Sequence, residues 1–320
     1  MTDKVLAVEV NGLVKKFGDN TAVDRVSFTI EQGCICAMLG PNGAGKTTVI
    51  NMLATLLKPD AGEAKIFGYD INKDAEIVRQ LIGLTGQFAT IDEQLTAMEN
   101  LTIFGQLLDL SKKDAKKKAV ELLEEFGLTE AAKRELSKFS GGMRRRLDLA
   151  ASLISNPPLI FLDEPTTGLD PRARMQIWDT IRKLVKNGAT VLMTTQYLDE
   201  ADQLADRIIV IDNGRVVGND TPDKLKRKVG LLSLHIVVRK MDTAEAGAKI
   251  IEKILGTEVK ILQDKLTTSI KDTNRLSEVL EALKEVDIEL EEINVVKPTL
   301  DEVFFALTGN DPMQKEEETK

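Results

Sequence analysis

The sequence predicts a larger α/β domain followed by a smaller α+β domain. A glycine-rich segment, residues 40–48, joins an apolar strand pattern to an apolar helix pattern, and a second apolar strand pattern, residues 159–164, ends in two adjacent acids. Both features are typical of a parallel sheet whose strands end at a binding edge. In the last part of the chain, strand and helix patterns follow in the order β-α-β-β-α-β, which indicates a ferredoxin-like domain.

The first strands belong to an antiparallel sheet in this prediction. Residues Leu6–Val10 and Ser27–Ile30 cluster or alternate apolar side chains over short spans. Such spans are typical of strands at the edge of a domain, so we expect an antiparallel edge sheet before the parallel one.

The glycine-rich segment matches the phosphate-loop pattern G-x-x-x-x-G-K-[ST]. Residues 34–39 before it are almost all apolar and predict a buried strand, while Val49–Leu57 predict a helix. Glycines let such a loop turn its N–H groups inward, and the following helix adds its positive end. Lys46 would then face the β- and γ-phosphates of a nucleotide, and Thr47 would ligate Mg²⁺. An ordinary glycine-rich turn is the alternative interpretation.

Two polar or aromatic side chains near this loop are further candidates. Phe17 has two equally supported interpretations, a core side chain or a ring that stacks on the base of the nucleotide. Residues Leu81–Gln87 predict a short strand that ends in the polar residue Gln87.

A helical insertion is predicted over residues 90–156, where Leu101–Leu108 and Ala115–Phe126 carry apolar residues at helix spacing. It contains the segment Phe139-Ser140-Gly141-Gly142-Met143. Ser140 and the two glycines form a polar, permissive cap on a helix that continues to Ile154, and so offer a second anion-binding helix end. An ordinary N-cap is the alternative.

The acidic strand, Leu159–Glu164, carries the candidate chemistry. Burying carboxylates costs free energy unless a cation or partner compensates, so acids at the end of a buried strand indicate a metal or substrate. Asp163 fits the Mg²⁺ ligand and Glu164 the group that activates water. A plain N-cap role for either acid is the alternative, although Pro165 and Thr166 offer helix-starting features downstream.

The sheet then continues to the end of the first domain. Residues Thr190–Thr194 predict a buried strand followed by Thr195-Gln196, and residues 207–217 predict a hairpin turned by Asn213-Gly214. Residues 219–223 are expected to be a linker. We therefore expect the first domain to span residues 1–222.

The second domain is expected over residues 223–309. A short closing helix is predicted at Asp301–Leu307, and the polar residues 310–320 are expected to form a disordered tail. The strands and helices before them are predicted at 231–238, 244–255, 257–262, 266–270, 274–283 and 288–295.

Composition narrows the classes of function. The chain has 320 residues, a net charge of −8 and a pI near 5.1, which argues against nucleic-acid binding through bulk positive charge. No run approaches the roughly 20 apolar residues that cross a bilayer. We therefore expect a cytoplasmic chain that reaches the membrane only through a partner. Cys34 and Cys36 are expected to be small core residues, and the single histidine, His235, excludes paired-histidine catalytic or metal sites.

Taken together, the chain resembles the ATP-binding cassette (ABC) ATPases, and most closely the ATPase subunits of drug exporters related to daunorubicin resistance. The resemblance to the cassette covers about residues 4–220, and its most diagnostic stretch is Phe139–Met143. It implies a P-loop NTPase cassette with a RecA-like core, an antiparallel β subdomain and a helical subdomain.

The resemblance also implies a role for each motif residue. Phe17 would stack on adenine, Glu164 would activate water, Gln196 would contact the γ-phosphate, and Asp170 would couple two sites. Mg²⁺ or its waters would be held by Thr47, Gln87 and Asp163. The residues expected to contact the phosphates are Gly40, Pro41, Asn42, Gly43, Ala44, Gly45, Lys46, Thr47 and Thr48, with Ser140, Gly141, Gly142 and Met143 from a second subunit.

The implied assembly is a homodimer that sandwiches two ATP molecules and drives a separate integral-membrane permease, at the inner face of the cell membrane, with no nucleic acid. A soluble ABC ATPase that acts on nucleic acid or the ribosome is the alternative, and a regulatory nucleotide-binding module is a third. For the C-terminal domain, a dimer contact ranks before regulation or permease docking.

Two departures from the family pattern are visible. Gln196 stands where a switch histidine is usual, so slow hydrolysis is expected because an amide carries no positive charge. Met143 replaces the common glutamine and is followed by Arg144, Arg145 and Arg146. We expect at least one of these arginines to pair with a carboxylate or a partner chain, and the other two to be solvated.

Overall fold

The computed structural model describes residues 5–85, 91–229, 232–270, 272–296 and 299–308. Its contacts divide the chain into two compact units, residues 1–222 and 223–320, which are described separately. The expected tail, residues 310–320, lies outside the described residues.

The first unit begins with a four-stranded antiparallel sheet in the order β2-β1-β4-β5. The predicted strands are confirmed but are longer than expected, because the hairpin between β1 and β2 continues through polar residues to the pair Phe17↔Asn20. The strands are β1 (Leu6–Phe17), β2 (Asn20–Glu31), β4 (Ala61–Ile66) and β5 (Tyr69–Asp70).

The second sheet of this unit has six strands in the order β10-β9-β3-β8-β7-β6. All neighbours are parallel except β9 and β10, which form the predicted hairpin around Asn213-Gly214. Every residue of β3, β7 and β8 is buried, which explains their continuous apolar runs. The strands are β3 (Ile35–Leu39), β6 (Ile82–Thr85), β7 (Leu159–Asp163), β8 (Thr190–Thr195), β9 (Arg207–Asp212) and β10 (Arg215–Asp220).

Helix α1 (Lys46–Leu53) contacts both sheets, through β2 and β7, and its buried side chains join one apolar core with them. The predicted helix 49–57 is wrong at both ends. It begins earlier because Gly45, at φ 103°, forms its N-cap, and it ends earlier because Thr55 turns to φ 62°.

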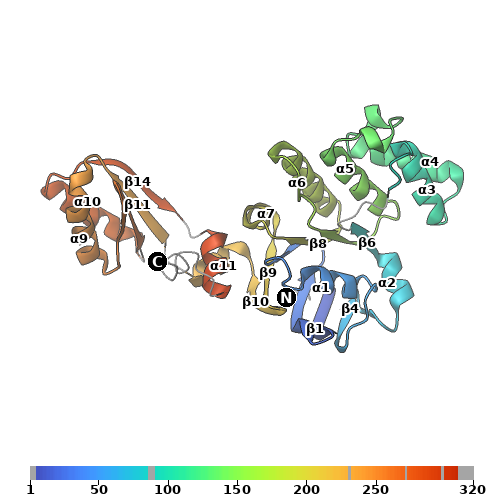
Figure 1. Ribbon diagram of the computed structural model, residues 1–320, viewed down its shortest axis with the longest axis horizontal. Coiled ribbons are helices and arrows are strands. Elements are labelled where there is room, and N and C mark those ends of the chain that lie inside the picture. The colour runs from blue at the N-terminus through green and yellow to red at the C-terminus, as the bar shows by residue number, and fades with distance from the viewer. Residues whose placement is uncertain (1–4, 86–90, 230–231, 271, 297–298, 309–320) are drawn as a thin grey trace. The chain divides into compact units, whose positions relative to one another are not determined.

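The helical insertion is confirmed and gathers α3, α4 and α5 beside the six-stranded sheet (Figure 1). Thr96 and Glu99 form a capping box on α3, and Ser111 caps α4, so local hydrogen bonds define both starts. The helices of the unit are α2 (Ala75–Leu81), α3 (Ala97–Leu107), α4 (Lys112–Glu125), α5 (Gly141–Ser152), α6 (Pro171–Lys186) and α7 (Leu198–Leu204), with 3₁₀ turns at Thr129–Ala131 and Leu136–Lys138.

The predicted linker at residues 219–223 is wrong. Strand β10 continues to Asp220, which pairs with Ile208, and helix α8 (Pro222–Val229) starts two residues later. Polar side chains are tolerated there because β10 lies at the edge of its sheet.

The second unit confirms the β-α-β-β-α-β order. Its strands pair only antiparallel, in the order β12-β13-β11-β14, which is the ferredoxin-like arrangement. Side chains of α9 and α10 share one apolar core with the sheet. The elements are β11 (Leu232–Val238), α9 (Ala244–Leu255), β12 (Lys260–Leu262), β13 (Lys265–Ile270), α10 (Leu276–Glu285), β14 (Leu290–Val296) and α11 (Leu300–Thr308), with 3₁₀ turns at Met241–Thr243 and Thr273–Arg275.

Candidate functional site

The phosphate loop, residues 40–48, connects β3 to α1 and requires its glycines. A Cβ atom at Gly40 would lie 2.3 Å from the Ile211 carbonyl oxygen, and one at Gly45 would lie 2.4 Å from the Ala22 carbonyl oxygen. Gly43 has φ +81°, and a Cβ there would meet nothing within 4 Å. The loop is therefore packed on the strand side and open on the other, as a phosphate cradle needs to be.

Lys46 begins α1 with a side chain that is only 5% exposed. Its Nζ donates to the carbonyl oxygens of Gly40, at 2.8 Å, and Pro41, at 3.1 Å, and lies 3.9 Å from Oε1 of Glu164. Burial lowers the pKa of Lys46, while the charges of Glu164 and Asp163 act in the opposite direction. The ammonium group therefore lies between the phosphate loop and the acidic strand.

Asp163, at the end of β7, is buried and meets α1. Its Oδ1 accepts hydrogen bonds from the hydroxyls of Thr47, at 3.3 Å, and Thr194. A buried carboxylate beside a threonine hydroxyl is the hard-oxygen donor set that suits Mg²⁺, which is usually completed by waters and substrate phosphates. The sequence predicts Thr194 as a strand residue but not as a site residue, since a residue within a strand shows its partner only in the folded sheet.

Glu164 follows with a strained backbone, at φ 48°. Its N–H group donates to the carbonyl oxygen of Thr194, at 3.2 Å, and to the hydroxyl of Thr194, at 3.0 Å. Its Oε2 accepts from the Thr167 hydroxyl at 3.1 Å. No described helix starts next to Asp163 or Glu164, so the N-cap alternative for the two acids is wrong.

Helix α6 instead starts at Pro171, and Asp170 is its N-cap: Oδ1 accepts from the N–H of Ala173 at 2.9 Å. The helix start suggested at Pro165 and Thr166 is therefore wrong. The pair Asp170-Pro171 places Asp at the N-cap and Pro at the first helical position, which is a strong signal for a helix start. The segment before it lacks this pair.

Gln196 comes directly after β8, half-buried. Because β7 and β8 are parallel and Asp163 pairs with Thr194, Gln196 leaves the sheet at the same edge as Glu164. Gln87, the other predicted polar end, lies outside the described residues.

Phe17, at the end of β1, is 51% exposed, so its interpretation as a core residue is wrong. The ammonium group of Lys15 lies 5.8 Å from the centre of its ring and is itself held by Asp60 at 2.9 Å. Stacking on a base stays a prediction for this exposed ring.

The Ser140–Met143 segment starts α5, and the Ser140 hydroxyl accepts from the N–H of Met143 at 3.3 Å. The predicted cap is confirmed. Gly142 lies against α6, where an added Cβ would be 2.9 Å from that of Ala173.

The three arginines after Met143 behave differently from the expectation of two solvated side chains. Arg144 pairs with Glu93 at 2.6 Å, which confirms one carboxylate partner. Arg145 instead donates to the carbonyl oxygens of Pro165, at 2.9 Å, and Asp163, at 2.8 Å, and Arg146 donates to that of Phe126 at 3.0 Å. Arg145 therefore ties α5, the helix that Ser140 caps, to the acidic strand.

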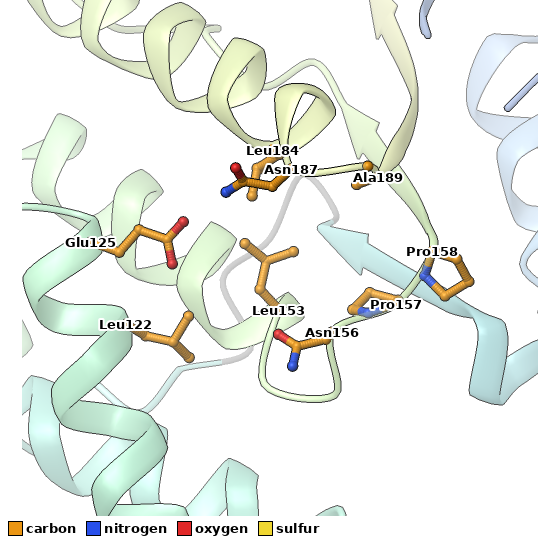
Figure 2. Close-up of a pocket in the computed structure, with 10 residues that line it drawn as sticks. Leu122, Glu125, Leu153, Asn156, Pro157, Pro158, Leu184, Asn187 and Ala189 are labelled. Carbon is orange, nitrogen blue, oxygen red and sulfur yellow. The ribbon is translucent and has the colours of Figure 1, made fainter. Parts of the chain in front are cut away.

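A cavity of about 310 Å³ lies elsewhere and holds none of these residues (Figure 2). It is lined by the ends of α4, α5 and α6, with Leu122, Leu153 and Leu184, and by Pro158 and Ala189 just before β7 and β8. Those residues precede the strands whose far ends carry Asp163 and Gln196. The cavity is therefore separate from the candidate site.

Comparisons with known proteins agree with this geometry. The model of the ABC transporter family matches residues 23–167. A daunorubicin resistance ATP-binding protein of Streptomyces coeruleorubidus is 48% identical over 97% of this chain and 98% of that protein. The daunorubicin/doxorubicin resistance ATP-binding protein of Streptomyces peucetius is 46% identical over 97% of this chain and 94% of its own.

Solved structures show the same fold. An ATP-binding cassette of an ABC transporter in its ADP conformation is similar with a TM-score of 0.63 at 28% identity, covering 70% of this chain and 94% of that chain. A dimeric cassette in a post-hydrolysis state, bound to ADP and Pi, is similar with a TM-score of 0.60 at 30% identity, covering 67% of this chain and 98% of that chain. Among the described residues, no helix combines the length and the hydropathy of a membrane-spanning segment. The chain therefore belongs to the ABC transporter family, in the group of the daunorubicin-resistance ATP-binding proteins, and is an ATPase.

Proposed function

We propose that this ATPase powers the export of a drug-like or lipophilic substrate through a separate membrane permease. The observation that carries the proposal is the meeting of Lys46, Thr47, Asp163 and Glu164, from two distant parts of the chain, at one edge of a parallel sheet. The relatives from Streptomyces supply the substrate class, since both are named as daunorubicin resistance proteins.

In the proposed site, each residue has one task. Lys46 exchanges the carbonyl oxygens of Gly40 and Pro41 for phosphate oxygens when nucleotide enters the cradle. Thr47 and Asp163 hold Mg²⁺, which when bound offsets the negative charge of the phosphates. Glu164 orients the attacking water and accepts its proton, because its carboxylate is fixed by Thr167 beside Lys46.

The active form in this proposal is a homodimer. Ser140 to Met143 form a capped helix start that can accept the γ-phosphate of ATP held by the other copy. The solved relative with ADP and Pi is dimeric, which supports this arrangement. Asp170, which caps α6 close to α5, would pass the state of one site to the other.

The proposed permease contact is a groove of about 320 Å³ between β6, α3 and α5. It is lined by Phe104, Leu108 and Asp148, and the neighbouring side chains of Ile103 and Leu107 are exposed apolar groups on α3. An exposed apolar stripe beside a groove fits a short helix of a membrane subunit.

Reconstitution with a candidate membrane permease in lipid vesicles tests the proposal. Vesicles that hold both subunits should accumulate daunorubicin when Mg·ATP is supplied, and should lose this uptake when Glu164 is replaced by Gln. Uptake that continues without ATP hydrolysis would overturn the proposed function.

A further inference from the structure

Glu200, on α7, is a buried acid that the proposed mechanism does not use. Its side chain is 0% exposed. Oε1 accepts from the Thr166 hydroxyl at 2.8 Å and from the indole N–H of Trp178 at 3.0 Å, while Oε2 makes no hydrogen bond of ordinary geometry among the described residues. Burial raises the pKa of Glu200, and the side chains of Thr195, Thr166 and Trp178 oppose this shift. Burying a carboxylate costs free energy, so the contacts of Glu200 indicate what the buried group contributes to the fold.

The carboxylate joins three segments of the candidate site. Thr166 follows Glu164 by two residues, and Trp178 lies on α6, the helix that Asp170 caps. Glu200 itself follows Gln196 by four residues. Since β7 and β8 are parallel, the segments after them leave the same edge of the sheet. One buried group therefore bridges the residues that follow both strands.

Arg174, on α6, contacts the same segments as Glu200 does. Its guanidinium lies 4.8 Å from the ring of Tyr197 and 5.5 Å from the ring of Trp178, and it pairs with Asp199 at 2.9 Å. The N–H of Tyr197 also donates to the Thr195 hydroxyl at 2.9 Å. Tyr197 is the residue next to Gln196, so the segment that carries the amide is held on both sides.

We propose that Glu200 is a positioning residue for ATP hydrolysis, whose carboxylate keeps the turn after Glu164 and the segment of Gln196 at a constant separation so that both side chains address one γ-phosphate. This inference rests on the proposed roles of Glu164 and Gln196. A small change in that separation would misplace the reacting groups without touching the phosphate loop, and reaction rates are sensitive to such misplacement.

Two substitutions separate positioning from general stability. Glu200→Gln keeps an oxygen that can accept from both Thr166 and Trp178, whereas Glu200→Ala removes the bridge. With Glu200→Ala we expect kcat to fall about tenfold or more while KM for ATP changes less than about twofold, and with Glu200→Gln we expect kcat within about threefold of the wild type. Ile177→Val, a buried residue of α6 beside Trp178, is the control for a minor loss of packing.

The single tryptophan of the chain adds a readout that does not depend on turnover. In a Glu164→Gln background, Mg·ATP should change the emission of Trp178, and the additional Glu200→Ala substitution should abolish that change. Should Glu200→Ala fail to fold, Thr166→Val takes its place, because valine keeps the shape and removes one donor.

Wild-type kcat in Glu200→Ala or Thr166→Val would overturn the inference, as would a parallel loss of kcat and ATP affinity, which a merely structural role predicts. The Glu164→Gln variant distinguishes a failure of the proposed catalytic site from a failure of the positioning role. If Glu164→Gln stays active, the role of Glu164 is wrong; if Glu164→Gln is inactive and Glu200→Ala is fully active, only the positioning role is wrong.

Discussion

Replacing Glu164 by Gln tests the central assignment because the change keeps the shape of the side chain and removes its charge. We expect kcat to fall by about 10² to 10⁴-fold, the usual contribution of a general base, while Mg·ATP still binds. Because the bound ATP is then not cleaved, the ATP-bound dimer should accumulate. Thr167→Val is the matched comparison, because it removes the hydrogen bond that fixes Oε2 but leaves the charge, so kcat should fall less than in Glu164→Gln.

The structure also sets the size of a stability effect. Oε1 of Glu164 lies 3.9 Å from Nζ of Lys46, and the two side chains are 9% and 5% exposed. At this separation the attraction of two unit charges is about 4 kcal/mol for an effective dielectric constant of 20. The amide of the Glu164→Gln variant costs less to desolvate than the carboxylate does, so the expected net loss of unfolding free energy in the free protein is smaller than this attraction.

Nucleotide should reverse this loss, because the phosphates replace Glu164 as the partner of Lys46. We therefore expect Mg·ATP to raise the Tm of Glu164→Gln more than that of the wild type, and sedimentation to show a dimer at saturating ATP. An active variant would refute the assignment of the base. A variant that stays monomeric with saturating ATP, alone and with its permease, would refute the shared-site dimer.

Four further results are expected. Lys46→Ala should lose ATP affinity in a titration with fluorescent ATP, and unchanged binding would remove Lys46 from the site. Gln196→His should raise the hydrolysis rate, because a cation can then face the γ-phosphate, and an unchanged rate would place residue 196 away from it. Arg145→Ala should lower the unfolding free energy by about 2–4 kcal/mol in urea, since two carbonyl groups lose a charged donor, whereas Arg172→Ala on the exposed face of α6 should not. Burial raises the pKa of Asp148 from 3.8 to about 6, so the unfolding free energy should fall as pH rises from about 4 to about 6, by at most about 3 kcal/mol, and Asp148→Asn should lose this slope.

The arginine run shows where prediction from the sequence ends. A helical pattern places Arg144, Arg145 and Arg146 in one turn, and nothing local tells them apart. In the fold, α5 packs against the segment after β7, so Arg145 meets the carbonyl oxygens of Asp163 and Pro165, while Arg144 faces Glu93. Those partners come from distant parts of the chain, and only packing brings them together.

Strand and helix ends show the same limit. The hairpin of β1 and β2 continues past its apolar residues because Lys15 and Lys16 pair across the strands with Val23 and Thr21. The residues Asp170-Pro171 predict the start of α6 from the sequence alone. The weaker signal at Pro165 favoured a different start, which the structure does not have. The positive φ of Glu164 had no sequence signal, since the residue that its N–H group contacts, Thr194, lies on the neighbouring strand.

The sequence by itself determined the phosphate loop, the acidic strand, the Asn213-Gly214 hairpin and the ferredoxin-like order, because each depends on spacing and on residue types within a few positions. Only the tertiary structure decided that Lys46 faces Glu164, that Thr194 holds Asp163 and that Glu200 bridges two strand ends. Each of these contacts joins residues far apart along the chain, and their separation in space is set by the register of the parallel strands.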